Sequence, residues 1–190
     1  MAVLILGLIL FLGTHSISII KPDLRGNIVA RFGVVPWQAV YAILSLIGFM
    51  LILSGFGMAG QSPILVYDPA TWMRHITLLL MLPVFPLLFA AYLPGRIQTA
   101  VKHPMLLAVK IWAFAHLLAN GTLADILLFG AFLAWAVADR ISLKHRVGPP
   151  VQGAPPSPLN DAIAIVGGLL FYLLFMFWLH KALIGVAPIG

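Results

Sequence analysis

Long apolar stretches, separated by short polar or proline-containing segments, dominate the pattern along the chain. A helix that crosses a bilayer needs about 20 mostly apolar residues, and its backbone groups must bond to one another because lipid offers no partners. Six stretches meet or approach this requirement, at approximately residues 2–20, 36–59, 72–93, 104–119, 122–138 and 161–186. The pattern therefore predicts an all-α integral membrane protein, a single domain over residues 1–190 built as a bundle of about six transmembrane helices.

Two connections between the predicted helices stand out. Asn120-Gly121 joins the fourth helix directly to the fifth, which predicts a tight helical hairpin. Residues 148–158 are rich in proline and glycine, so we expect a non-helical, mobile linker before the sixth helix.

Basic residues fall in alternate connections of the predicted bundle. Those after the first, third and fifth helices are Lys21, Arg25, Arg31, Arg96, Lys102, Arg140, Lys144 and Arg146. Short cytoplasmic loops of membrane proteins carry an excess of lysine and arginine. These connections are therefore expected to face the cytoplasm, and both termini the opposite side.

Composition narrows the chemistry that is available. The chain is 62% hydrophobic and 8% charged, against about 25% charged in soluble domains, which excludes a soluble globular protein. The net charge of +6 is scattered along the chain, which indicates membrane topology and no nucleic-acid partner. Cysteine is absent, so disulfides and thiolate metal sites are excluded. The lipid bilayer is the partner that this composition indicates.

A few polar residues lie inside the predicted helices, where burial of an ionisable group costs several kcal/mol unless the group finds a partner. His15 lies in the first helix, about five residues from its inner end. His116 and Asn120 are four residues apart and share a face of the fourth helix, and Asp125 follows the turn. Two interpretations stay open. These groups form a ligand site, or His15 bonds to a neighbouring helix while Asn120 and Asp125 cap the hairpin.

Lys110 and His103 have similar alternatives. Lys110 lies about a third of the way into the fourth helix, where it reaches the headgroups or pairs with a substrate or cofactor carboxylate. His103 precedes Pro104 at the start of that helix, an interfacial position. Six histidines without cysteine favour imidazole chemistry, such as a haem held between facing helices. A histidine-only zinc site is less favoured because three ligands would have to converge.

The most recognisable motifs lie around the predicted hairpin. They are Leu93-Pro94-Gly95-Arg96, Lys102-His103-Pro104, Ala115-His116-Leu117-Leu118-Ala119-Asn120-Gly121, Thr14-His15-Ser16 and Trp72-Met73-Arg74-His75. With these motifs the whole chain resembles the NnrU family of bacterial membrane proteins, named for an association with nitrite and nitric oxide reduction in denitrifying bacteria. The resemblance implies a place in the bacterial inner membrane, with both termini on the periplasmic side by the charge pattern.

The NnrU family is similar in turn to the 15-cis-zeta-carotene isomerases, membrane enzymes that use haem b. This resemblance implies haem b as the cofactor, His15 and His116 as its axial metal ligands, and an isoprenoid or carotenoid-like substrate for cis/trans isomerisation. The His103-Pro104 motif also matches. The isomerases have a histidine pair in the next helix, where this chain reads Leu133-Ala134-Trp135-Ala136.

The haem hypothesis assigns a role to each remaining polar residue. His103 is a substitute ligand or gate, Asn120 and Asp125 orient an imidazole, and Lys110 or Arg96 pairs with a haem propionate. At 1.5 Å per residue His15 lies roughly 8 Å, and His116 roughly 18 Å, from the inner edge. Pairing His15 with His103, or His116 with His75, fits these depths better, so the ligand pair stays open.

Two other functions stay open. His103-Pro104 and Asp139-Arg140 faintly resemble the isoprenylcysteine-type methyltransferases, in which His103, Arg96 and Asp139 would surround S-adenosylmethionine. The chain has one acidic residue where those enzymes have two. A non-enzymatic assembly factor would use its polar residues for helix packing alone, with close helix contacts at Gly48, Gly55 and Gly130.

Overall fold

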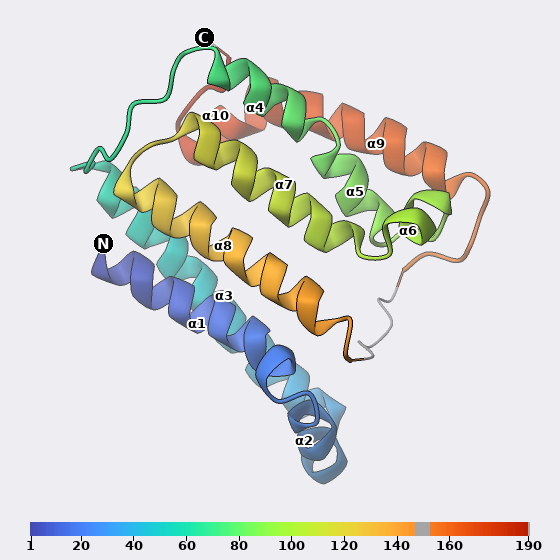
Figure 1. Ribbon diagram of the computed structural model, residues 1–190. Coiled ribbons are helices and arrows are strands. Elements are labelled where there is room, and N and C mark those ends of the chain that lie inside the picture. The colour runs from blue at the N-terminus through green and yellow to red at the C-terminus, as the bar shows by residue number, and fades with distance from the viewer. Residues whose placement is uncertain (147–152, 190) are drawn as a thin grey trace. The chain divides into compact units, whose positions relative to one another are not determined.

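The computed structural model describes residues 1–146 and 153–189, and the regular secondary structure of this part of the chain is helical, with one isolated bridge between Leu65 and Thr122 (Figure 1). The elements are α1 (Ala2–Ile20), α2 (Leu24–Phe32), α3 (Val34–Gly60), α4 (Met73–Met81), α5 (Val84–Ala90), α6 (Arg96–Val101), α7 (Pro104–Ala119), α8 (Leu123–Ser142), α9 (Asn160–Leu174), the π-helical turn η1 (Phe175–Leu179) and α10 (His180–Ile184).

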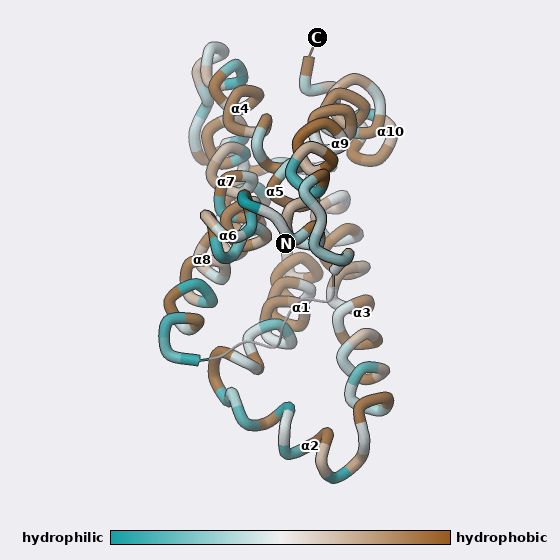
Figure 2. The backbone as a smooth tube through the Cα atoms, turned by 90° about the vertical axis from the view of Figure 1, so that its right-hand side faces the viewer, coloured by the Kyte–Doolittle hydropathy of each residue, from teal (hydrophilic) through white to brown (hydrophobic). Residues whose placement is uncertain are grey.

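The membrane character of the chain is confirmed. The helices long and apolar enough to cross a bilayer are Ala2–Ile20, Val34–Gly60, Met73–Ala90 and Asn160–Ile184, and Pro104–Ala119 is a shorter apolar helix. Figure 2 shows hydrophobic residues along α1, α3 and α9. The fifth predicted span corresponds to α8, which has the length of a span but carries Asp125, Asp139 and Arg140. Apolar length therefore supports four spans and one shorter helix, rather than six equivalent spans.

The structure differs from the prediction in two local details. The third predicted helix is confirmed as an apolar span, Met73–Ala90, but it is interrupted at Leu82-Pro83 between α4 and α5, because proline lacks a backbone N–H and its ring clashes with the preceding turn. The basic connection after α1 contains the nine-residue helix α2, in which no residue is buried.

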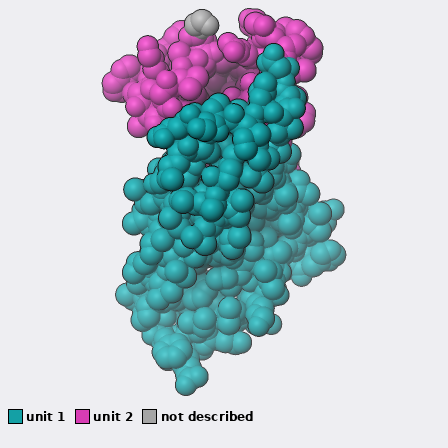
Figure 3. Space-filling model, turned by 90° about the vertical axis from the view of Figure 1, so that its left-hand side faces the viewer, with its two compact units in different colours: residues 1–68, 121–147 teal, residues 69–120, 148–190 magenta. Residues whose placement is uncertain are grey.

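The described chain divides into two compact units, each made of two stretches of sequence (Figure 3). Unit 1 contains residues 1–68 and 121–147, and unit 2 contains residues 69–120 and 148–190. The predicted hairpin therefore connects the units, because α7 belongs to unit 2 and α8 to unit 1. Only Asn120, Gly121 and Thr122 separate these two helices, as the short turn in the sequence predicts.

Unit 1 is built on close packing of α1 against α3. A Cβ atom on Gly48 would lie 2.7 Å from the Phe11 nitrogen, and one on Gly55 would lie 2.6 Å from the Leu4 Cα. These pairs run in opposite directions along the chain, so the helices are antiparallel. The predicted close contacts at Gly48 and Gly55 are confirmed. Gly130 has open space at its Cβ position, so the prediction for that glycine is wrong.

Unit 2 packs α4 and α5 against α7 and α9. Val84, Leu87 and Ala108 form its buried apolar core. The Thr77 hydroxyl donates to the Ala115 carbonyl oxygen over 2.9 Å, and the Tyr172 hydroxyl donates to the Leu78 carbonyl oxygen over 3.0 Å. Each polar side chain thus uses a main-chain acceptor on another helix, which satisfies it within an apolar interior.

The segment before α9 is anchored to the loop before α6. Asp161 accepts hydrogen bonds from the backbone N–H groups of Arg96 (2.9 Å) and Ile97 (3.1 Å). The Asn160 amide donates to the Pro94 carbonyl oxygen over 2.8 Å, and Ala154 N–H donates to the Tyr92 carbonyl oxygen. The predicted mobile linker is non-helical over 153–157 but held at these points, and residues 147–152 lie outside the described part.

Candidate functional site

His15 lies in α1 of unit 1 with one ring nitrogen fixed. Its Nδ1 lies 2.7 Å from the carbonyl oxygen of Phe11, one helical turn earlier. A carbonyl oxygen can only accept, so Nδ1 carries the proton and Nε2 has a lone pair. The Phe11 ring stacks on the imidazole with centroids 4.2 Å apart. The ring is therefore held in both tautomer and plane.

His116 has the same local arrangement in α7 of unit 2. Its Nδ1 lies 2.8 Å from the carbonyl oxygen of Trp112, again one turn earlier, which makes Nε2 the nitrogen without a proton. The Trp112 and His116 ring centroids are 5.5 Å apart. The side chain is half-buried.

An aromatic residue four positions before the histidine is the shared sequence signal. It occurs as Phe11 before His15 and as Trp112 before His116, and at none of the other histidines. Residues four apart lie on one helix face, so the aromatic ring can pack on the imidazole while its carbonyl accepts from Nδ1. The spacing of these aromatic residues and histidines is visible in the sequence alone.

Two further aromatic residues of unit 1 contact His15, and Ser45 lies one turn from one of them. The Tyr41 ring of α3 and the Trp135 ring of α8 meet the imidazole edge to face, with centroids at 5.3 and 6.0 Å. Ser45 follows Tyr41 by one turn. The Ser45 Oγ and the Trp135 Nε1 are inaccessible to solvent and have no hydrogen-bond partner within the described residues. Trp135 lies in the stretch 133–136, where the isomerases have a histidine pair, and the other two residues gave no sequence signal.

Asn120 and Asp125 make the contacts of helix caps. The Asn120 amide donates to the His116 carbonyl oxygen over 2.9 Å at the end of α7. Asp125, which is buried, accepts from the backbone N–H of Thr122, while the Thr122 hydroxyl accepts from Asp125 N–H. This reciprocal pair is a capping box that starts α8. These hydrogen bonds are the ones expected if Asn120 and Asp125 cap the two helices of the hairpin.

The residues before α4 support the turn between α7 and α8. The N–H groups of Val66 and Tyr67 both donate to the Gly121 carbonyl oxygen, and Leu123 N–H donates to Ile64. A Cβ on Gly121 would collide with the Tyr67 carbonyl oxygen, which explains the glycine. Burial, with a smaller contribution from the Asp125 charge, raises the pKa of the Tyr67 hydroxyl above its ordinary value of 10.0.

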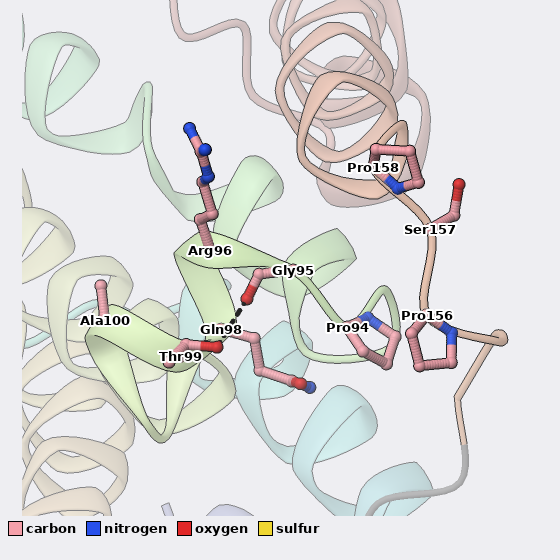
Figure 4. A pocket seen from close by; sticks show the side chains of 9 residues that line it. All are labelled: Pro94, Gly95, Arg96, Gln98, Thr99, Ala100, Pro156, Ser157 and Pro158. Carbon is pink, nitrogen blue, oxygen red and sulfur yellow. Dashed lines mark hydrogen bonds between the residues drawn. The ribbon is translucent and has the colours of Figure 1, made fainter.

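Arg96 lines a shallow pocket of unit 2. This hollow, about 730 Å³ in volume, lies between residues 94–100 and residues 156–158. Figure 4 shows that the Arg96 side chain extends away from the linker residues Pro156 and Ser157. The side chain is exposed, so it is accessible to an anionic group, whereas the Arg96 backbone N–H is bonded to Asp161.

The other candidates of unit 2 occupy separate positions. Lys110 is half-buried within α7, and His103 is half-buried at its N-terminal boundary. His75 is exposed and lies two residues before Thr77, which bonds to α7. A helix turns by about 200° over two residues, so His75 lies on the side of α4 away from α7. Helix geometry therefore does not favour the His116–His75 pair.

Asp139, the acidic residue of the methyltransferase alternative, already has a partner. Its carboxylate forms an ion pair with Arg146, and both side chains are largely shielded from solvent. Asp139 lies in unit 1, whereas His103 and Arg96 lie in unit 2. His15 and His116 likewise belong to different units. The structure thus defines the surroundings of each histidine separately. Within the described residues no group of three or more His, Cys, Asp or Glu side chains could hold a metal ion.

The apolar helices define the chain as a multi-pass α-helical membrane protein. Residues 3–188 match the model of the family described as NnrU protein, so the chain belongs to the NnrU family. No curated protein and no solved structure matches it significantly.

Proposed function

We propose that this NnrU protein binds haem b, and that the Nε2 atoms of His15 and His116 are the groups that would hold its iron. The observation that carries the proposal is the shared geometry of these two histidines. In each, a main-chain carbonyl four residues earlier accepts from Nδ1, which fixes the tautomer that a metal ligand requires.

The donor chemistry of the chain fits this cofactor. Two neutral imidazoles are sufficient to hold a haem in a helix bundle, whereas a histidine-only zinc site needs three converging ligands. An aromatic ring one turn earlier packs near each candidate imidazole, which limits the positions the ring can take. Haem b would supply one-electron redox chemistry, in keeping with a role in nitrite and nitric oxide metabolism, and binding of nitric oxide would require one histidine to leave the iron.

The residues of the chain would then have distinct tasks. Phe11 and Trp112 hold the imidazole planes through their rings and the tautomers through their carbonyl groups. Asn120 acts indirectly, because its amide bonds to the main-chain carbonyl of His116 at the end of α7. Lys110 and Arg96 are cations that suit a haem propionate, and His103 is the substitute ligand.

The isomerase activity expected from the similarity to the carotene isomerases is a further proposal that depends on haem. No contact described above identifies a carotenoid-like substrate, so haem binding is the function that the geometry supports best.

A visible absorption spectrum of the detergent-purified protein tests the proposal. We expect a Soret band, and sharp bands between 500 and 600 nm, the usual region of reduced b-type haem, after addition of dithionite, with about one haem per chain. A colourless protein after expression with abundant haem, and after haem addition to the purified protein, would contradict it. Thermal stabilisation of that colourless protein by S-adenosylmethionine would favour methyl transfer instead.

A further inference from the structure

Unit 1 contains two hydrogen-bond donors that its own residues do not satisfy. The Trp135 Nε1 on α8 and the Ser45 Oγ on α3 are buried and have no partner within the described residues. A buried polar group without a partner costs about 1–3 kcal/mol, and such groups in natural proteins commonly mark a water, ion or ligand site.

Both donors lie in the part of unit 1 that surrounds His15. Trp135 meets the imidazole edge to face at 6.0 Å between centroids. Ser45 is one turn from Tyr41, whose ring is 5.3 Å from the same imidazole. On the far side of Ser45, Phe49 packs against Phe11 at 6.3 Å. Trp135 therefore contacts the proposed iron ligand, and Ser45 lies on α3 between Tyr41, which contacts the imidazole, and Phe49, which contacts Phe11.

The numbers of donors and acceptors near His15 indicate what kind of group the Trp135 indole and the Ser45 hydroxyl bind. Without iron, His15 Nε2 is an acceptor, and a water molecule could accept from Trp135 and donate to His15. When Nε2 binds iron it can no longer accept a hydrogen bond, so the Trp135 indole N–H and the Ser45 hydroxyl group still need an acceptor. The indole N–H can only donate, so the group that satisfies it must supply an acceptor oxygen.

The charge at this end of unit 1 favours an anion as the acceptor. His15 is five residues from the end of α1, roughly 8 Å along the helix axis. The cationic residues at the ends of α1, α2 and α8 nearest to it are Lys21, Arg25, Arg31, Arg140, Lys144 and Arg146. The acidic residues there are Asp23 and Asp139, and Asp139 is already paired with Arg146.

We infer that Trp135 and Ser45 form the binding site in unit 1 for one carboxylate of the haem, with the indole N–H and the hydroxyl group donating to a propionate oxygen. This inference rests on the proposed function.

Haem release from the full-length protein tests the inference. Transfer of haem to excess apomyoglobin is measured for the wild type, Trp135→Phe and Ser45→Ala. Phenylalanine keeps an aromatic ring while removing the N–H group. We expect each variant to release haem about tenfold faster, because each loses a hydrogen bond to a charged group. The matched controls, Trp178→Phe and Ser54→Ala, change exposed residues and should release haem at the wild-type rate.

Two further measurements separate a propionate from water. With haem dimethyl ester, which lacks the carboxylate charge, the difference between wild type and Trp135→Phe should fall to about threefold or less. The indole N–H resonance of Trp135, assigned through its loss in Trp135→Phe, should shift between the haem-free protein and the protein with diamagnetic zinc protoporphyrin. An unchanged resonance, or an equal tenfold effect with the ester, would assign the donors to water and overturn the inference.

The outcomes also distinguish this inference from the proposed function. A wild-type protein that binds no haem contradicts the proposed function itself. A wild-type protein that binds haem, together with Trp135→Phe and Ser45→Ala variants that release it at the wild-type rate, leaves haem binding intact and overturns only the propionate site.

Discussion

Individual glycines decide how closely the helices of unit 1 approach. Gly48 and Gly57 lie on the same helix, yet a Cβ on Gly48 would lie 2.7 Å from a backbone nitrogen of α1, whereas one on Gly57 would meet no atom within 4 Å. Sequence alone can nominate small residues for contacts, but it cannot say which face of the helix is covered. That is why Gly48 and Gly55 were correctly predicted and Gly130 was not.

Gly48→Ala should therefore destabilise the protein, by about 1–3 kcal/mol, because the added methyl group forces α1 and α3 apart. Gly57→Ala is the matched control and should leave stability unchanged or raise it by up to about 1 kcal/mol through helix propensity. Thermal unfolding in detergent measures both. Equal stability of the two variants would show that α1 and α3 are not in close contact at Gly48.

Asp161 is a second residue whose role depends on tertiary structure. It lies in the first turn of α9, yet its carboxylate caps α6 by accepting from Arg96 and Ile97 N–H. A Cβ on Gly95 would collide with this carboxylate, which explains the glycine in the Leu93-Pro94-Gly95-Arg96 motif. The motif is visible in the sequence, but its pairing with Asp161, which bonds to Arg96 from 65 residues away, depends on the tertiary structure.

Asp161→Asn should weaken this cap, because an amide is uncharged and offers one acceptor oxygen. We expect a loss of about 1 kcal/mol, seen as faster hydrogen exchange of the Arg96 and Ile97 amides. Asp68→Asn changes an exposed carboxylate of unit 1 and should leave these amides unaffected. Unchanged exchange in Asp161→Asn would contradict the capping role.

Among the elements, α8 shows that polar residues inside an apolar sequence can serve to cap a helix. The Asn120-Gly121 turn predicted its start correctly, and Thr122 with Asp125 forms the capping box. From the sequence, Asp125 could belong to a ligand site or cap a helix. The contacts with Thr122 show that it caps α8. The break between α4 and α5 was missed because apolar residues continue through Pro83, so hydropathy does not change where the helix ends.

Thr122→Ala should remove the hydroxyl that accepts from Asp125 N–H and cost about 1 kcal/mol of stability. Thr122→Ser keeps the hydroxyl group and should retain most of that stability. Hydrogen exchange at Asp125 and Ile126 gives the local readout. A Thr122→Ala variant with wild-type exchange at both amides would show that the cap does not hold the start of α8.

For the whole molecule, composition and hydropathy were sufficient to predict an all-helical membrane protein, because apolar length alone identifies most spans. The division into two units could not be predicted, since it depends on contacts between stretches far apart in sequence, such as residues 1–68 with 121–147. The candidate site was predicted as a set of histidines. Its surroundings, including Trp135 and Ser45, required the structure.

The central proposal is that His15 and His116 are the ligands of a haem iron, and electron paramagnetic resonance of the ferric protein tests it most directly. We expect a low-spin signal from the wild type and from His145→Ala, which changes an exposed histidine outside the site. His15→Ala and His116→Ala should each lose this signal, through a high-spin iron or loss of haem, because only one ligand remains. A low-spin signal that persists unchanged in either of these two variants would contradict the claim.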